Sequence, residues 1–467
     1  MQEKLYFYYT NDLHSNFEQW AKAAGYLKNA KDSRLDAGES CWLVDIGDHV
    51  DRVHPIAEAF MGKANVGLLN DAGYDLATIG NNEGITLAHQ DLFHLYDEAE
   101  FEVVCANLHS LDQQSPDWLK SVSTLTSYNG VKVGVIGLTA PFNAFYELLG
   151  WHISSPYATL EAHIRKMKES ADVIILLSHL GLNEDQEIAR RHPEIDVIIG
   201  GHTHHLLHSG ENVNNTLITA AGKHCTYAGE VILTWDHHQK KLVNKEAYTR
   251  DITKLAKDLP TEQKLLELYE KAEEIMGENV VTIQEPIEVQ WFSPTPLMER
   301  LTERVQDWTK ADCAMLNAGL LLDHFPAGEV TYHDIHRICP HPINPVVVEL
   351  KGDELVEVIR ASLTKDFMEL KLKGFGFRGE VLGRMVFTGV DVETGCRPDG
   401  EEYVRKVTMN GQPLDMERNY TVATADTFTF GRLLPEVAKS ERKEYFLPEF
   451  LRNLLADTLR KNYGIHS

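Results

Sequence analysis

Four histidines follow a single apolar run in the stretch IDVIIGGHTHHLLH, residues 195–208. They are His202, His204, His205 and His208. The apolar run predicts a buried strand, and the two glycines after it predict a turn. Imidazoles at such a turn either face water or hold a metal ion, because neutral histidine is the commonest metal ligand in proteins. The residues at other strand ends help to distinguish these two interpretations.

Metal-capable residues follow four more apolar runs in the first half of the chain. The carboxyl ends of parallel strands form one edge of a sheet, where ligands commonly bind. Turn chemistry is the competing explanation, because Asp and Asn are common turn residues. The residues are Asp12 and His14 after LYFYYT, Asp48 after CWLVDIG, Asn81 after DLATIG, and His179 after DVIILLS, in addition to His202 and His204 after DVIIGG.

Together these side chains offer three carboxylate or amide oxygens and four imidazoles. A tetrahedral zinc site takes only four ligands, so the set favours two ions that share a bridging carboxylate. Paired ions about 3.5–4 Å apart stabilise both the attacking and the leaving oxygen of a displacement at phosphorus. The residue types therefore predict phosphoester hydrolysis at a centre of two divalent metal ions. Mn, Zn, Fe and Co all accept such mixed ligands, so the metal is left open.

The whole chain of 467 residues, 43% hydrophobic and 25% charged, has the composition of a globular protein with about two to three domains. Its first residues, MQEKLYFYYTND, lead directly into a strand pattern, and no apolar run is long enough for a membrane span. We therefore expect a cytoplasmic protein with no membrane partner. A formal net charge of −25 argues against nucleic-acid binding, and six scattered cysteines without a C-x-x-C pair predict free thiols.

Strand-like and helix-like stretches alternate from residue 1 to about residue 240, which is the pattern of strands covered on both faces. The charged segment PTEQKLLELYEKAEEIMG at 260–277 has apolar residues at helical spacing and predicts a connecting helix. A second α/β set then begins with ERLTERVQDWTK and CAMLNAG. The sequence therefore predicts two domains joined by a helix.

Five short blocks carry a family resemblance: TNDLHS, DIGDHVD, IGNNE, SHLG and GGHTH. In this order and at these intervals they resemble the metal-binding blocks of calcineurin-like metallophosphoesterases. With LNAG in the second half, the chain resembles the two-domain 5′-nucleotidase family, which includes bacterial UDP-sugar hydrolases. The resemblance implies an α/β fold: a β-sandwich of mixed sheets flanked by helices, a linker helix, and a C-terminal α/β domain that binds substrate. The expected ranges are 1–250, 251–280 and 281–467.

The resemblance also assigns ligands to the two ions. It implies Asp12, His14, Asp48 and His204 on one ion, with Asp48 bridging to a second ion held by Asn81, His179 and His202. His205 and His208 match no ligand position, and we expect them to be solvated or to orient ligands. In such a centre, hydroxide held between the ions attacks phosphorus.

One block departs from the family pattern. Where the family has a histidine and an aspartate beside the phosphoryl group, this chain has Asn82 and Ile85. An amide such as that of Asn82 donates a hydrogen bond to a phosphoryl oxygen but is no general acid, and such a loss typically costs about 10²–10⁴-fold in rate. Three explanations stay open: another proton donor, with His49 and His205 as candidates; a leaving group that needs no proton; or a site that only binds.

The second half departs too. The family's N-G-G-x-x-R-like block reads Asn317-Ala318-Gly319-Leu320-Leu321-Leu322, and the positions of its two base-clamping rings are occupied by Arg384 and by Leu433 or Leu434. The stretch KGFGFRGE offers Phe375, Phe377 and Arg378, which together with Asn317 are the candidate substrate-binding residues. The competing interpretation is a flexible loop with its rings packed inward. The same alternatives hold for His333, His336, Arg337 and His341.

We therefore expect a dimetal phosphohydrolase of nucleotide catabolism that acts on 5′-nucleotides or related phosphate esters, small molecules rather than macromolecules. A phosphodiesterase or pyrophosphohydrolase acting on nucleotide anhydrides is the alternative if the leaving group needs no acid. A metal-dependent nucleotide sensor with little turnover is the second alternative, and ligand would then only stabilise the fold. The oligomeric state is left open.

Overall fold

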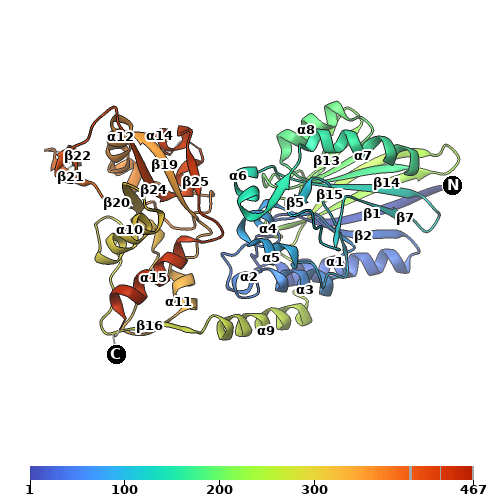
Figure 1. Ribbon diagram of the computed structural model, residues 1–467. Helices are drawn as coiled ribbons and strands as arrows, with labels where there is room; N and C mark the ends of the chain where they lie inside the picture. The colour runs from blue at the N-terminus through green and yellow to red at the C-terminus, as the bar shows by residue number, and fades with distance from the viewer. Residues whose placement is uncertain (399–401, 432, 465–467) are drawn as a thin grey trace. The chain divides into compact units, whose positions relative to one another are not determined.

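The computed structural model describes residues 1–398, 402–431 and 433–464 (Figure 1). The chain divides into two compact units, Met1–Ala272 and Glu273–Ser467. Each unit has its own sheets and its own hydrophobic core, so each is described by itself.

The first unit is a sandwich of two mixed sheets. The seven-stranded sheet has the order β15-β14-β1-β2-β3-β4-β6 and the six-stranded sheet the order β12-β13-β11-β10-β8-β7. The strands of the first sheet are β1 (Gln2–Thr10), β2 (Ser40–Asp45), β3 (Leu76–Ala77), β4 (Glu102–Val104), β6 (Leu119–Lys120), β14 (Tyr227–Asp236) and β15 (Lys241–Asp251). Those of the second are β7 (Val122–Thr126), β8 (Lys132–Thr139), β10 (Val173–His179), β11 (Val197–Gly200), β12 (Glu211–Val213) and β13 (Thr216–Thr219).

Successive side chains of a strand point to opposite faces of its sheet, and those on the inner faces form the core between the two sheets. Phe7 and Tyr9 of β1 belong to the same buried cluster as Ile175 and Leu177 of β10. The intervening residue Leu176 points to the other face, where it packs with residues of α7 and α8. Because both faces of β10 are covered, its sequence reads as an unbroken apolar run.

Helices cover the outer faces of the sandwich (Figure 1). The second sheet is covered by α7 and α8, and the first sheet by α1. The helices of this unit are α1 (Trp20–Asp36), α2 (Pro55–Ala59), α3 (Lys63–Ala72), α4 (Asn81–Thr86), α5 (His89–Phe93), α6 (Asn143–Tyr146), α7 (Pro156–Ser170) and α8 (Leu182–Arg191), with a small sheet of β5 (Leu108–Ser110) and β9 (Trp151–Ile153).

The predicted α/β sandwich of mixed sheets is confirmed, with one correction to how the ligand-bearing strands are arranged. β1, β2 and β3 lie in the first sheet, whereas β10 and β11 lie in the second. The candidate ligands therefore come from the ends of two facing sheets and not from one sheet edge. The strand pair β14 and β15, which closes the first sheet beside β1, was not among the predicted strands.

A helix at the division between the units, α9 (Leu259–Ile275), lies inside the predicted linker range 251–280. The second unit has a five-stranded mixed sheet in the order β20-β17-β24-β19-β25. Its strands are β17 (Cys313–Asn317), β19 (Pro345–Lys351), β20 (Met385–Thr388), β24 (Asn419–Ala425) and β25 (Lys443–Tyr445), and smaller sheets hold β16 (Asn279–Ile283), β18 (Gly328–Thr331), β21 (Asp391–Cys396), β22 (Glu402–Met409) and β23 (Gln412–Pro413). Its helices are α10 (Pro296–Thr309), α11 (Tyr332–Ile338), α12 (Gly352–Ser362), α13 (Lys365–Met368), α14 (Pro435–Lys439) and α15 (Leu451–Tyr463).

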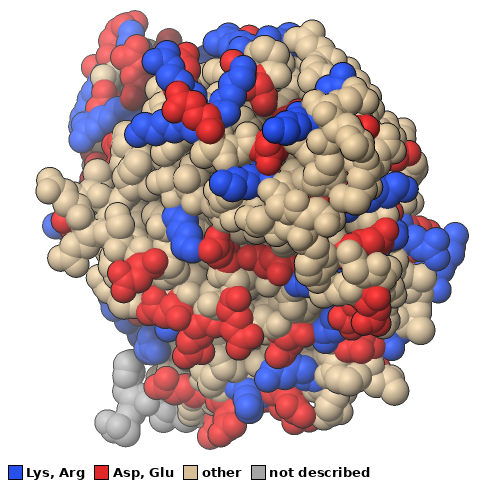
Figure 2. All heavy atoms as spheres, turned by 90° about the vertical axis from the view of Figure 1, so that its right-hand side faces the viewer, with Lys and Arg blue, Asp and Glu red and all other residues tan. Residues whose placement is uncertain are grey.

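The chain has 70 acidic residues against 45 lysines and arginines, which gives the formal net charge of −25. Figure 2 shows one face, on which acidic side chains gather across the lower half with basic side chains between them. An anionic ligand therefore needs local positive charge wherever it binds. Among the helices that the structure describes, none combines the length and the apolar character that a membrane span requires.

Candidate metal centre

Two groups of potential metal ligands lie in the first unit, each with its ligand atoms within 4.8 Å of one another. The first group consists of Asp12, His14 and His204. His14 Nε2 lies 3.0 Å from His204 Nε2 and 3.8 Å from Asp12 Oδ1, and His204 Nε2 lies 3.5 Å from the same carboxylate oxygen. Two ring nitrogens and a carboxylate oxygen thus converge on one point.

The second group consists of Asp48, His179 and His202. His179 Nε2 lies 3.3 Å from Asp48 Oδ2, and the rings of His179 and His202 pack edge to face with centroids 5.2 Å apart. Asp48 also connects the two groups, because the same Oδ2 lies 3.7 Å from His14 Nε2. One carboxylate oxygen is therefore shared between the groups, as a bridging ligand requires.

The tautomer of His179 is fixed by the backbone. Its Nδ1 lies 2.7 Å from the carbonyl oxygen of Ile46, which only accepts, so Nδ1 carries the hydrogen. In the neutral ring the lone pair on Nε2 then points at the centre, and this buried atom makes no hydrogen bond among the described residues. Asn81 Oδ1 is likewise buried and unpartnered. Buried polar atoms without partners are costly, so these two fit ligands of a cation.

The charges at the centre also suit a cation. Burial favours neutral His179, but the carboxylates of Asp48 and Asp12 outweigh it and raise its pKa to about 10. Burial opposes the charged forms of Asp12 and Asp48 as well, yet hydrogen bonds and charges of the surrounding histidines lower the pKa of both carboxyl groups. The protein therefore places two buried carboxylates where positive charge must accompany them.

Left-handed backbone presents the ligands. Asp12, His14, Asp48, His202 and His204 all have positive φ, between 50° and 70°. This conformation is uncommon for residues other than glycine and costs free energy unless neighbouring contacts hold it. The hydrogen bonds that hold it here run from Asp12 N to Gly47 O (3.1 Å), from His14 N to Asp48 O (2.8 Å) and from His202 N to Asp12 Oδ2 (3.0 Å).

Glu83 and Gly80 fix the loop that carries Asp48. The buried Glu83 carboxylate accepts hydrogen bonds from the backbone N–H groups of Asp48, Val50 and Gly80, at 3.0, 2.8 and 2.9 Å. A Cβ atom on Gly80 would lie 2.1 Å from Asp48 Oδ1, so the close approach requires glycine.

Asn82, predicted to donate a hydrogen bond to a phosphoryl oxygen, lies beside His14 of the first group of candidate ligands. Its side-chain amide is 2.9 Å from His14 Nδ1, and the Asp51 carboxylate is 3.5 Å from the same nitrogen. If His14 holds a metal through Nε2, then Nδ1 carries the hydrogen and donates it to the Asp51 carboxylate. This placement supports an orienting role for Asn82.

Neither of the two candidate proton donors is a member of a ligand group. His49 is buried against the indole of Trp20, with its Nδ1 3.1 Å from Asn65 Nδ2. Burial lowers the pKa of His49 to about 3, so the ring is neutral near pH 7 and the position gives no support to its predicted role as acid. His205 is exposed and bonded to Thr203 (2.9 Å), and the exposed His208 is bonded to Thr249 (2.8 Å).

Comparison with known proteins decides the family. Residues 5–206 match the Calcineurin-like phosphoesterase family, and residues 277–432 match the 5′-nucleotidase C-terminal domain. The chain is 42% identical, over 98% of its length and 99% of the relative's, to the uncharacterized metallophosphoesterase YunD of Bacillus subtilis. This chain belongs to the metallophosphoesterase family.

Solved structures agree on the fold. A 5′-nucleotidase precursor from Thermus thermophilus superposes on the metallophosphoesterase with a TM-score of 0.61 at 19% identity, covering 99% of this chain and 97% of the other. The NAD nucleotidase of Haemophilus influenzae gives 0.68 at 16% identity, with the same coverage. The resemblance inferred from the five blocks is confirmed, and the chain is a phosphoester hydrolase of a class that binds divalent metals.

The predicted substrate-binding residues of this metallophosphoesterase divide into two sets. Phe375 is 48% exposed and lies parallel to Phe430, with ring centroids 6.0 Å apart and planes at 7°. Phe377 is only 2% exposed and stacks on His341, which leaves no ring face for a base. Asn317 is also buried, and its amide donates to Leu382 O at 2.7 Å. The interpretation of rings packed inward therefore holds for Phe377 but not for Phe375.

His341 positions the glycine-rich loop. Its Nδ1 accepts a hydrogen bond from Arg378 N at 3.0 Å, and its Nε2 donates to Leu320 O at 3.0 Å. Burial lowers the pKa of His341 to about 3, so the ring is neutral and its two nitrogens divide the roles of donor and acceptor. The guanidinium of Arg378 donates to Phe377 O at 3.1 Å and lies partly buried.

The other basic residues of this region have structural contacts. His336 is buried, and Arg337 pairs with Asp323 at 2.9 Å. Arg384, at the position of the family's first ring, forms a bidentate ion pair with Glu402 at 2.5 and 2.9 Å.

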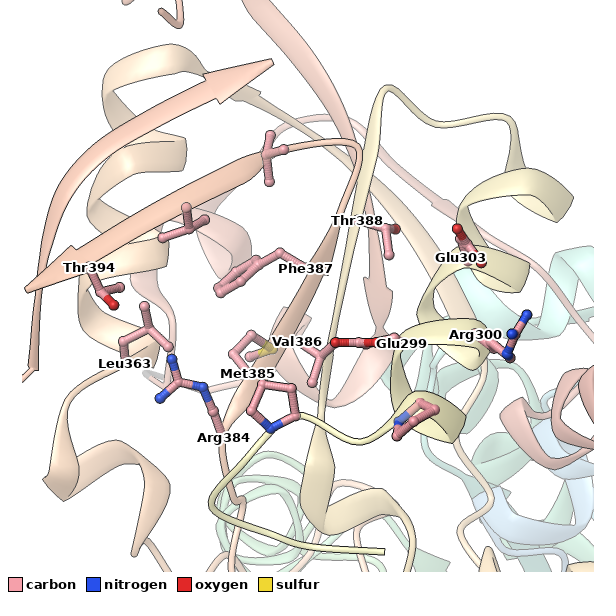
Figure 3. A pocket seen from close by; sticks show the side chains of 14 residues that line it. Glu299, Arg300, Glu303, Leu363, Arg384, Met385, Val386, Phe387, Thr388 and Thr394 are labelled. Carbon is pink, nitrogen blue, oxygen red and sulfur yellow. The ribbon is translucent and has the colours of Figure 1, made fainter. Parts of the chain in front are cut away.

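A pocket of about 540 Å³ lies between α10 and the strands β20 and β21 of the metallophosphoesterase's second unit (Figure 3). Met385 and Phe387 contribute apolar surface, and Glu299 and Arg300 of α10 line the opposite side. None of the four predicted substrate-binding residues is among those that line it. The predicted residues and this pocket are therefore separate features.

Three residues near the metallophosphoesterase's ligands were not singled out from the sequence. Asp51 and Glu83 lie inside the blocks DIGDHVD and IGNNE, so their positions next to ligands were the available signal. His224 belongs to no block, and its ring packs edge to face on His14 with centroids 6.0 Å apart. A lone histidine in the sequence carries no comparable signal.

Proposed function

We propose that the chain hydrolyses 5′-nucleotides or related nucleotide phosphates at a centre of two divalent ions. The observation that carries the proposal is the shared Asp48 Oδ2, which lies 3.7 Å from His14 Nε2 in one ligand group and 3.3 Å from His179 Nε2 in the other. Two adjacent groups with one common carboxylate are the arrangement that a phosphoester displacement uses.

The protein's own residues set the geometry of the reaction. Divalent ions bound here would activate water as the nucleophile and neutralise charge on the phosphoryl oxygens. His179 is held by Ile46 O so that its Nε2 faces the centre, and His14 is held by Asn82 and Asp51. Orienting partners of this kind typically change metal affinity or activity by about 10–100-fold when removed.

A second candidate is hydrolysis of a nucleotide anhydride or diester, and the position of Asn82 favours it. The family's general acid is absent here, and the amide that replaces it is 2.9 Å from a ligand histidine. A leaving group that is already a stable anion needs no proton from the enzyme, whereas an alkoxide does. Pyrophosphates would then be cleaved faster than monoesters.

Within the second unit, considered by itself, we propose Phe375 as a residue that stacks on a nucleobase. Its ring is 48% exposed, sits at a positive φ of 52° in a loop with glycines on both sides, and is parallel to Phe430. Aromatic rings presented in this way stack on nucleobases with about 1–3 kcal/mol per base.

Phosphate release across a panel of substrates tests both candidates. The purified chain would be incubated with Mn²⁺ or with chelator and with nucleoside monophosphates, nucleoside diphosphates, nucleotide sugars and cyclic nucleotides. An added phosphatase would reveal monoester products. Chelator-sensitive release from monophosphates supports the 5′-nucleotidase, and turnover confined to anhydrides or diesters supports the second candidate. Saturable binding of Mn²⁺ and nucleotide without turnover of any substrate refutes both.

A further inference from the structure

The loop Ala221–Cys225 is tied to the metal centre through the backbone. The side chain of Asn11, next to the ligand Asp12, accepts from Ala221 N at 3.0 Å and donates to Gly222 O at 2.6 Å. His224 N donates to Asp12 O at 2.9 Å. Hydrogen bonds near its start and near its end therefore hold this loop against Asn11 and Asp12, which follow strand β1.

Two consecutive non-glycine residues of this loop have left-handed backbone. φ is 58° at His224 and 49° at Cys225. Such strain costs of the order of 1–3 kcal/mol per residue and persists where surrounding structure holds it, often at functional sites. The Cys225 side chain is buried with 1% exposure and anchors the loop, while His224 is turned toward the centre and stays partly exposed.

The ring of His224 lies beside the first ligand group on a side that solvent reaches. It meets the ring of His14 at 88° with centroids 6.0 Å apart. His224 is not a member of either group of potential ligands, so it stands next to the centre and does not complete it. The exposed Lys223 precedes it and adds positive charge in a chain whose formal net charge is −25.

We propose that His224 donates a hydrogen bond to an oxygen of the phosphoryl group bound at this centre, and that Lys223 supplements its attraction for the anion. The inference rests on the proposed phosphoester function. It identifies a substrate-contacting side chain outside the five family blocks, in ring contact with the same His14 that Asn82 contacts. A neutral imidazole is sufficient, because one of its ring nitrogens carries a hydrogen at any pH.

The test measures binding of inorganic phosphate to the Mn²⁺-loaded chain by titration calorimetry, with Mn²⁺ per chain measured by elemental analysis. His224→Gly removes the side chain and relieves the positive φ. His224→Asn keeps an N–H donor in a residue that also tolerates positive φ. His208→Asn is the matched control, since His208 is exposed and bonded to Thr249.

We expect His224→Gly to raise the Kd of phosphate about tenfold or more, which is the loss of one hydrogen bond to a charged oxygen. His224→Asn should stay within about threefold of the wild type, and bound Mn²⁺ should be unchanged in all variants. Phosphate affinity unchanged in His224→Gly would overturn the inference, and so would loss of Mn²⁺, which would make His224 a metal-holding residue. Phosphate binding that depends on His224, in a chain that turns over no nucleotide, would uphold the inference while refuting the proposed function.

Discussion

Binding of Mn²⁺ should strengthen steeply with pH, because the ion displaces a proton from His179. The carboxylates of Asp48 and Asp12 overcome the effect of burial and raise the pKa of this ring to about 10 in the metal-free protein, from an ordinary 6.5. A metal ligand must be the neutral ring, so the ion that His179 would hold releases this proton when it binds. Between about pH 6.5 and about pH 8.5 the association constant should rise about tenfold per pH unit, or about a hundredfold and ~2.7 kcal/mol in total. Burial opposes the charged form of His14, but Asp51 and the other carboxylates outweigh it and raise the pKa of His14 as well, so the slope is at least one proton.

Rising pH strengthens metal binding but lowers the stability of the metal-free protein. The protonated His179 stabilises the fold fully below its unfolded pKa of 6.5, and this contribution is lost as pH rises toward about 10. The difference in Tm between Mn²⁺-loaded and chelated protein should therefore widen with rising pH. Taking this difference cancels the titration of groups far from the centre.

Competition with a chelating dye, in buffers across this pH range, measures the association constant directly. Calorimetry in buffers of different ionisation enthalpy counts the protons released. His179→Asn should lose one proton from the slope, whereas His205→Asn, which changes an exposed ring bonded to Thr203, should keep it. A Kd for Mn²⁺ that does not change with pH in the wild type would refute the reasoning.

Three further substitutions have defined outcomes. Gly80→Ala should abolish Mn²⁺ binding measured by elemental analysis, because the added Cβ would lie 2.1 Å from Asp48 Oδ1 and backbone must move; retained binding and activity would contradict the geometry. Asn82→Ala should weaken Mn²⁺ binding about 10–100-fold by releasing His14, and an unchanged Mn²⁺ Kd with slower turnover would instead return Asn82 to the phosphoryl group. Phe375→Ala should raise KM for nucleotides about 5-fold or more and leave KM for a phosphate ester without a base unchanged, and equal effects on both substrates would count against stacking.

The strand ends predicted which metal-capable residues come together, and the family resemblance predicted how they divide between two ions. Asp12, His14, Asp48, His179, His202 and His204 indeed meet in two groups. Asn81 adds a buried, unpartnered oxygen. What the apolar runs did not show was that the strands belong to two facing sheets, since a strand buried on both faces has the same sequence pattern in either arrangement.

The positions of two further histidines, His49 and His224, depend on tertiary contacts that the sequence pattern does not show. His49 is adjacent to a ligand in sequence, but its ring packs on Trp20. His224 is far from the blocks in sequence and is brought to His14 by its hydrogen bond to Asp12. The positions of the His49 and His224 rings are set by loops, so neither residue spacing nor composition could predict which of the two lies beside His14.

The exposure of Phe375 and Phe377 could not be predicted from the sequence either. The two rings are separated by one glycine, yet one is 48% exposed and the other 2%. The stacking of Phe377 on His341 decides the difference, and these residues are far apart in the sequence.

The left-handed backbone at five ligand positions limits how this centre can change in evolution. Asn, Asp, His and Gly tolerate positive φ, whereas β-branched residues do not. Asn, Asp and His carry an oxygen or nitrogen that binds metals, whereas Gly carries none. A tolerated substitution at Asp12 or His204 therefore either replaces one ligand with another or removes the ligand without disturbing the backbone. We therefore expect substitutions at these positions in related chains to change which metal is preferred, while the backbone of the loops stays the same.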